Sequence, residues 1–291
     1  MQFEEVADTI DTEDNQRGGA DDDSRLTIYR QHGRPYLIAS GIDEGIKFIF
    51  TMSPLMTKVA SEADFIQCDI TYDECKDYPY IFNAVAFDKI SMEWMVVARL
   101  RLDSQTSAAY ALSFKKVFDK CRSSNEDFEL GSTLQGVVTD WSDAEINGLK
   151  MAVGKRTAEK LLKGCKVHWQ RSCQRVADKV LSSHDRKREK DIFLKICSQI
   201  QILSSTLSIV ACFETLSGVR SVAQLVDILP TLCSTDDVQF IDDNCNWSAA
   251  KHWAQWWARA NHLKMLSKSF SAMDDDIWKR CPSSSYQCSR T

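Results

Sequence analysis

Two short apolar stretches decide the fold: Asp64-Phe65-Ile66-Gln67-Cys68-Asp69 and Leu134-Gln135-Gly136-Val137-Val138-Thr139-Asp140. Each run is typical of a buried strand, and each delivers an aspartate at its carboxyl end. In open α/β sheets the crevice beyond the carboxyl ends of the strands is the usual ligand site. Two carboxylates that converge there repel each other unless a cation or a proton lies between them. The pattern therefore predicts a divalent-cation site at Asp69 and Asp140.

Each aspartate taken alone has an ordinary structural explanation. An Asp after a strand is commonly a turn former or the N-cap of the next helix. In the run Trp141-Ser142-Asp143-Ala144-Glu145, Ser142 or Asp140 can cap a helix, and Asp143 and Glu145 suit its positive end. Only the two aspartates together favour a site.

The composition indicates a globular chain with a core of its own. Its 291 residues, 44% hydrophobic and 10% aromatic, suffice for one large domain with an insertion or for two small ones. No apolar stretch approaches the roughly 18 residues that cross a bilayer, and the N-terminus lacks the features of a signal peptide. We expect a soluble nuclear or cytoplasmic protein without a membrane partner. Its eleven cysteines are then thiols or metal ligands rather than disulfides.

Charge is distributed unevenly, although the net charge is only −5. Residues 1–23 hold nine acids and one base, which predicts a disordered acidic tail over 1–24. Residues 150–190 hold thirteen Lys or Arg and four acids, a local excess of nine positive charges. Such clusters bind the phosphate backbone of DNA, although a solvated helix face gives the same pattern. The candidate DNA contacts are Lys155, Arg156, Arg171, Arg175, Arg186, Lys187 and Arg188.

Hydrophobic periodicity predicts a mixed α/β fold. Alternating or continuous apolar runs predict five strands, over 64–70, 80–87, 94–100, 134–140 and 164–169. Helical spacing predicts two intervening helices, near 110–121 and 142–153. The resulting order β-β-β-α-β-α-β is that of a sheet with three antiparallel strands, to which parallel strands are added through helices. Apolar stripes at helical spacing predict further helices, over 169–180, 193–203 and 222–229.

Four regions follow from this order. After the tail at 1–24 comes a transitional segment over 25–62, with short strands near 26–29 and 48–50. The α/β core occupies 63–170, and the rest of the chain, 171–291, is helical.

Three motifs in the core resemble those of the Mutator-like (MULE) transposases, a branch of the RNase H-like integrase and transposase superfamily. Asp69-Ile70-Thr71-Tyr72 resembles the D-x-T-[YF] signature, and Thr139-Asp140-Trp141-Ser142-Asp143-Ala144 resembles the T-D-x-x-x-A block. Cys165-Lys166-Val167-His168 resembles the C-x2-H motif that precedes a helical insertion. The resemblance covers about residues 60–291. It implies an RNase H-like mixed five-stranded sheet with flanking helices, followed by an all-α insertion that is incomplete at its C-terminal end.

The resemblance also implies a function, metal-dependent cleavage and transfer of DNA strands. Asp69 and Asp140 would be catalytic residues and ligands of Mg²⁺ or Mn²⁺, in a site where two ions about 3.5–4 Å apart stabilise the attacking and leaving oxygens. The family completes this site with a glutamate in a T-N-x-x-E block. The last residues, 286–291, contain no acid, and neither Glu214 nor Asp274-Asp275-Asp276 occupies the family position. We therefore expect a transposase fragment with weak or absent catalysis that retains affinity for DNA.

Cys165 and His168 have a structural and a metal-binding interpretation. A structural Zn²⁺ takes four ligands, and only Cys173 and His184 are available as completers. A buried thiol and a hydrogen-bonded histidine in the core are favoured over zinc. We expect both residues on a central strand and its exit.

Other interpretations stay open. Trp253, Trp256 and Trp257 have helical spacing, which favours core packing over stacking on DNA bases. The alternative functions are a domesticated, non-catalytic DNA-binding or protein-interaction module, and an unrelated α/β enzyme with a carboxylate metal site. Both a monomer and a homo-oligomer are compatible with the sequence.

Overall fold

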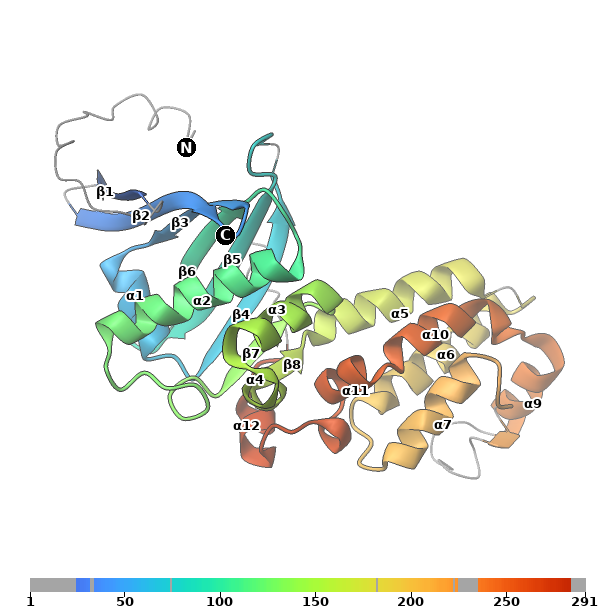
Figure 1. The fold of residues 1–291 in the computed structure, drawn as a ribbon. Coiled ribbons are helices and arrows are strands. Elements are labelled where there is room, and N and C mark those ends of the chain that lie inside the picture. The colour runs from blue at the N-terminus through green and yellow to red at the C-terminus, as the bar shows by residue number, and fades with distance from the viewer. Residues whose placement is uncertain are drawn as a thin grey trace.

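The chain forms an α/β lobe and a helical lobe, which are joined by a long helix (Figure 1). The computed structural model describes residues 25–31, 34–73, 75–181, 183–221, 223–224 and 235–283. The acidic tail expected over 1–24, and most of the apolar stripe expected over 222–229, lie outside the described residues.

A single mixed sheet of eight strands forms the α/β lobe, in the order β1-β2-β3-β6-β5-β4-β7-β8. The strands are β1 (Arg25–Gln31), β2 (Arg34–Asp43), β3 (Ile46–Met52), β4 (Phe65–Tyr72), β5 (Tyr80–Asp88), β6 (Glu93–Leu102), β7 (Gly136–Thr139) and β8 (Leu162–Gly164). The helices of this lobe are α1 (Pro54–Ser61), α2 (Ser107–Ser124), α3 (Asp143–Val153) and α4 (Lys155–Leu161).

The predicted order of strands and helices from residue 63 onward is confirmed. Strand β4 pairs antiparallel with β5, and β5 pairs antiparallel with β6. The chain then crosses through α2 to β7, which pairs parallel with β4, and through α3 and α4 to β8, which pairs parallel with β7. The two aspartate-bearing strands are therefore adjacent and parallel, as we expected from the resemblance of the motifs to the RNase H-like fold.

The sheet is wider than the five strands that we expected, because β1, β2 and β3 extend it. Strand β3 pairs antiparallel with β6, so the segment 25–62 is part of the sheet and not merely a transition to it. Side chains of β3 alternate in burial, with Ile46, Phe48, Phe50 and Met52 turned inward. Strand β2 was missed because Pro35 and Gly41 interrupt its apolar pattern.

The predicted fifth strand over 164–169 is wrong beyond its first residue. Pairing with β7 ends at Thr139 and Gly164, and helix α5 (Lys166–Val180) begins two residues later with Cys165 as its N-cap. The apolar residues Cys165 and Trp169, spaced four apart, are consecutive turns of one buried helix face. Over so short a run, strand and helix periodicities cannot be told apart.

Aromatic packing fixes the covering helices on the sheet. Helices α1 and α2 lie over one face of the sheet (Figure 1). The ring of Phe114 on α2 meets the ring of Phe82 on β5 edge to face, with 5.3 Å between centroids. Ser53 caps α1 through its side chain, which accepts from the backbone N–H of Met56.

Beyond Gly164 the described residues form helices and no strand. After α5 these are α6 (Arg186–Ile200), α7 (Thr206–Leu216), α9 (Thr235–Asn244), η2 (Trp247–Ala250), α10 (Lys251–Trp257), α11 (Ala260–Leu266), η3 (Lys268–Phe270) and α12 (Asp275–Arg280).

Tryptophans join the two lobes, which confirms the core interpretation of this cluster. The centroid of the Trp257 ring lies 4.7 Å from the centroid of the Trp141 ring, at the end of the sheet. It also lies 4.7 Å from the centroid of the Trp169 ring on α5. The indole N–H groups of Trp253 and Trp257 both donate to the hydroxyl of Ser172. The position of α5 relative to the sheet is therefore fixed by packing.

Candidate functional site

Asp69 and Asp140 lie side by side at the carboxyl end of two parallel strands. The β4–β7 pairing runs from Phe65 opposite Gly136 to Gln67 opposite Val138. Asp140 is the first residue after β7, and Asp69 follows two residues after the last β4–β7 pair. Both side chains are half-buried, and the carboxyl groups are within hydrogen-bonding reach of each other.

The sequence predicted that strand β4 ends at Asp69, but the strand continues beyond this residue. Its pairing with β5 continues through Asp69 opposite Asn83 to Tyr72 opposite Tyr80. Only the β7 side of the strand ends early, because β7 has four residues. Because β7 is short, Asp69 pairs with no residue of β7. It can therefore face Asp140 on that side of β4, where the acid pair forms.

Crowding of the two carboxyl groups favours a proton on one of them. Burial, the charge of Asp140 and a hydrogen bond with Asp140 together raise the pKa of Asp69 from an ordinary value of 3.8 to about 7, and burial is the largest of these causes. At neutral pH the pair therefore carries one negative charge and part of a second. A divalent cation would replace that proton and favour the doubly ionised pair.

His168 provides a positive charge next to the pair. Its Nδ1 lies 2.8 Å from Oδ1 of Asp140 in a half-exposed ion pair. The hydrogen bond with Asp140, and a second with the side chain of Cys165, raise the pKa of His168 to about 10. The imidazole is therefore protonated at neutral pH, which partly neutralises Asp140.

Cys165 and His168 lie at the beginning of α5 rather than on a central strand. Strand β8, which precedes them, is the edge strand of the sheet, so the expected central position is wrong. The expected burial of the thiol is confirmed, because Cys165 is 0% exposed. A thiol with no exposed surface cannot attack a bound substrate, so the Cys165–His168–Asp140 sequence of contacts is not the nucleophilic triad that it superficially resembles.

The two residues considered as completers of a zinc site lie elsewhere. Cys173 hydrogen-bonds with Cys197 across the α5–α6 contact. The ring of His184 packs against Phe240, with 5.7 Å between centroids. A zinc site completed by Cys173 and His184 is therefore not formed.

Glu145 is a third acid beside the pair, and the sequence interpretation missed its importance. It lies in the first turn of α3, where we expected only a favourable interaction with the helix dipole. Instead the residue is 1% exposed, and burial together with the charges of Asp140 and Asp69 raises the pKa of its carboxyl group well above the ordinary value. One signal was present: Glu145 falls at helical spacing with the buried Gly148 and Leu149, so a charged residue occupies an apolar stripe.

The carboxyl group of Glu145 lacks partners. Neither oxygen makes a hydrogen bond of normal geometry within the described part of the chain, although the backbone N–H of Asp140 lies near enough to favour the charged form. Buried polar groups are nearly always hydrogen-bonded. An unsatisfied buried carboxyl group that is affected by the charge of an acid pair is a feature that a bound cation or a proton would explain.

The other acids considered as a third ligand have different partners. Glu214 lies on α7 in the helical lobe, where Oε2 is 2.7 Å from a guanidinium nitrogen of Arg220. Asp275 on α12 forms an ion pair with Lys268 at 2.8 Å. Within the described ranges, no three Cys, His, Asp or Glu side chains already stand at the distances that would hold a metal ion.

The candidate DNA contacts do not form one surface. Lys155 and Arg156 belong to the short helix α4, whereas Arg171 and Arg175 lie on the exposed face of α5. At the start of α6, Arg188 binds Asp237 at 2.9 Å, and Arg186 donates to the backbone carbonyl of Asp178. Lys187 is exposed on the same turn. Two other basic residues of the 150–190 segment are also engaged, since Lys163 is buried and Lys190 binds Asp178.

One face of α5 continues directly from the acid pair. His168, Arg171, Arg175 and Lys179 are spaced three, four and four residues apart, which places them on one side of the helix. Over the eleven steps from His168 to Lys179 the helix rises about 16 Å, a length comparable to about five base pairs of duplex DNA. The acid of this helix nearest the stripe, Asp178, is neutralised by Lys190.

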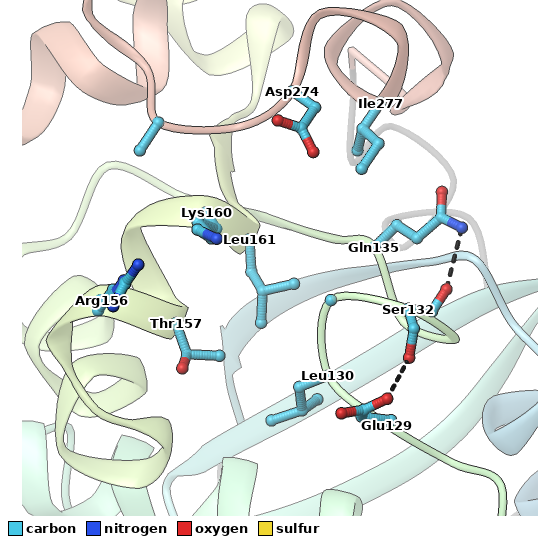
Figure 2. A pocket seen from close by; sticks show the side chains of 12 residues that line it. Glu129, Leu130, Ser132, Gln135, Arg156, Thr157, Lys160, Leu161, Asp274 and Ile277 are labelled. Atoms are coloured by element: carbon cyan, nitrogen blue, oxygen red, sulfur yellow. Dashed lines mark hydrogen bonds between the residues drawn. The ribbon is translucent and has the colours of Figure 1, made fainter.

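A cavity of about 320 Å³ lies at the opposite end of β7 from Asp140. Arg156, Thr157 and Lys160 of α4 line one side of it, with Gln135 and Asp274 across from them (Figure 2). The Glu129 side chain in its wall already accepts from the hydroxyl of Ser132. Both charge signs therefore line this cavity, and it is separate from the acid pair.

Comparisons of the chain with protein-family models, with curated proteins and with solved structures found no match. Among the described helices, none has the length and apolar character needed to cross a membrane.

Proposed function

We propose that this chain is a DNA-binding domain of the RNase H-like transposase type, similar to MULE transposases, which holds a divalent cation at Asp69 and Asp140. The observation that carries the proposal is the juxtaposition of these two carboxyl groups on adjacent parallel strands. Strand transfer chemistry needs acidic oxygens on Mg²⁺ or Mn²⁺, with phosphate oxygens of DNA as the remaining ligands.

The sheet order supports this assignment. Strands β6-β5-β4-β7-β8 are the third, second, first, fourth and fifth strands of the core, with the first, fourth and fifth parallel. The RNase H-like fold that the motif resemblance implies has an acid on its first strand and another after its fourth. Strands β1, β2 and β3 would then be an addition at the far edge of the sheet.

The α5 stripe supports DNA as the partner. Its basic side chains begin one turn from His168, so a phosphate backbone that lies along α5 would enter the acid pair at one end. Phosphate contacts of this kind position DNA without reading its sequence. Cleavage would need a further acidic ligand beside the pair, because two aspartates alone leave one ion of a two-ion site short of ligands.

A non-catalytic DNA-binding module is the second candidate. It is favoured by the ion pair of His168 with Asp140, because the imidazolium already supplies a positive charge to the acid pair. On that interpretation the acid pair keeps its proton, and only the α5 stripe is used.

Binding of a duplex at two salt concentrations tests the DNA part of the proposal. Wild-type chain should lose on the order of tenfold to a hundredfold in affinity between about 50 and 200 mM salt, because binding releases counterions. The Arg175→Glu, Lys179→Glu double variant should bind more weakly and with a shallower salt dependence. Its matched control, Lys47→Glu with Lys115→Glu, changes the same charge on exposed residues of the α/β lobe and should bind as the wild type does.

A nicking assay in Mg²⁺ or Mn²⁺ separates the two candidates. Trace cleavage that the Asp69→Ala, Asp140→Ala double variant abolishes would support a metal-dependent domain. Binding that is normal in this double variant, with no cleavage by either protein, would support the non-catalytic module. Affinity that ignores salt, or that survives charge reversal on α5, would remove DNA as the partner.

A further inference from the structure

We propose that Glu145 is the third carboxylate ligand of one divalent cation held by Asp69 and Asp140. This assignment rests on the proposed cation site and names a ligand of it that no motif of the chain indicates. Three observations about Glu145 carry it: its burial, the absence of a normal hydrogen bond at its carboxyl oxygens in the described part of the chain, and its place in the first turn of α3, where the charges of Asp140 and Asp69 act on it.

Burial makes Glu145 unusual among the acids of the described chain. Only Glu145 and Glu189 are buried charged acids among the described residues. Glu189 has the partners that burial demands, since Oε1 accepts from the indole N–H of Trp247 at 3.0 Å and Oε2 accepts from the backbone N–H of Ser183 at 2.9 Å. Glu145 is equally buried, and neither of its oxygens makes a hydrogen bond of normal geometry in the described part of the chain. Leaving such a group unpaired costs about 1–3 kcal/mol, which a cation ligand role would offset.

Helix packing fixes the backbone position of Glu145. Helix α3 begins three residues after Asp140, and its N-terminal turn is held by a hydrogen bond of 3.0 Å from the N–H of Ile146 to the carbonyl of Ser142. Gly148 then brings α3 against α2 so closely that a Cβ at that position would lie 2.3 Å from Cβ of Tyr110. The backbone under Glu145 is thus fixed, and its three side-chain torsions remain to place the carboxyl group.

The chemistry of the site suits a single hard cation. Asp69, Asp140 and Glu145 offer carboxylate oxygens, which Mg²⁺ and Mn²⁺ prefer. Because the three groups do not yet stand at ligand distance, binding requires rotation of the Glu145 side chain toward the pair.

Titration of Mn²⁺ into the full chain, followed by electron paramagnetic resonance of the free ion, tests the assignment without relying on activity. Wild-type chain should bind one Mn²⁺, and Asp69→Asn should abolish that binding. Glu145→Gln should weaken it roughly tenfold or more, since loss of an outer-shell partner alone costs 10- to 100-fold. The control Asp276→Asn, which removes an exposed acid on α12, should bind as the wild type does.

The outcomes distinguish failure of this assignment from failure of the proposed function. If Asp69→Asn abolishes binding and Glu145→Gln leaves it unchanged, Glu145 is not a ligand and the acid-pair site survives. If the wild-type chain binds no Mn²⁺, or binds it equally well as Asp69→Asn, both proposals are lost. Glutamine has nearly the shape of a protonated glutamate, so folding should persist. Should it not, Glu145→Leu, which suits burial, gives the same comparison with thermal unfolding as the check on folding.

Discussion

Three carboxyl groups and one imidazolium lie near the end of β7, and their protonation should control the free energy of unfolding. Asp69 binds a proton up to about pH 7 in the folded chain but releases it near 3.8 when unfolded. The free energy of unfolding should therefore fall as pH rises between these values, because the native state binds more protons there. For His168, stability is fully present below its unfolded pKa of 6.5 and is lost as pH rises through about 10.

The Asp69→Asn variant should separate the contribution of Asp69 to the pH dependence of stability from that of His168. In EDTA, unfolding by urea at about pH 5, 7 and 9 should show wild-type stability falling at each step. The variant should show a smaller fall than the wild type between pH 5 and 7, where only His168 still contributes, and should exceed the wild type at pH 8 by an amount on the order of 1 kcal/mol, since one pKa unit is about 1.4 kcal/mol. Asp119→Asn, which alters an exposed ion pair, is the control. A variant less stable than the wild type at pH 8 would contradict the crowding of the pair.

The sequence predicted the pair of Asp69 and Asp140, but it did not predict that Glu145 and His168 lie beside them. Asp69 and Asp140 each end a buried run, and strand pairing brought them together. Glu145 was interpreted as a helix-dipole residue, because proximity to an acid on another strand depends on the α2–α3 packing, which no local pattern encodes. The ion pair between His168 and Asp140 was missed for a similar reason: Cys165 to Trp169 fit a strand as well as a helix.

Among the elements, α12 depends on one buried lysine of the edge strand. Nζ of Lys163 donates to the carbonyl oxygens of Trp278 and Cys281, each at 2.7 Å, and lies 4.8 Å from the centre of the Trp278 ring. Immediately after α12, the carbonyl of Ser283 accepts from the N–H of Lys166 at 2.6 Å. The last described turn of the chain is thereby held against the start of α5.

Lys163→Met should loosen α12 while leaving the sheet intact. Two buried carbonyls would lose their donor, which should cost about 1–3 kcal/mol in the docking of this helix. Limited trypsin digestion should then cut faster after Lys279 and Arg280 than in the wild type. Lys160→Met, at an exposed position of α4, removes a lysine without touching α12 and should leave the rate of cleavage unchanged. Equal cleavage in both variants would contradict the anchoring role of Lys163.

Element prediction succeeded where periodicity was long and failed where it was short. The strands over 80–87 and 94–100 and the helices over 110–121 and 142–153 were recovered, because each presents several turns or alternations. Strand β8 has three residues and was merged with the start of α5. Strand β2 carries Pro35 and Gly41, and only its pairing on both sides, with β1 and β3, identifies it.

For the whole molecule, the acid pair stands where the α/β lobe meets the helical lobe. Helix α5 begins beside Asp140 and leads into the helical lobe (Figure 1). The Trp141, Trp257 and Trp169 rings fix that junction. A DNA strand along α5 would therefore meet a rigid site, which favours positioning over induced fit. We propose that this junction holds a divalent cation.

Iron-directed cleavage of the polypeptide locates that cation most directly. Fe²⁺ binds carboxylate sites that accept Mn²⁺ at least as tightly, and with ascorbate and peroxide it cuts the backbone close to where it is bound. We predict fragments that end near Asp69, Asp140 and the Cys165–His168 turn, suppressed by excess Mn²⁺ and missing from the Asp69→Asn, Asp140→Asn double variant. Cuts at other places in the chain, or cuts that persist in the double variant, would contradict a cation site at the acid pair.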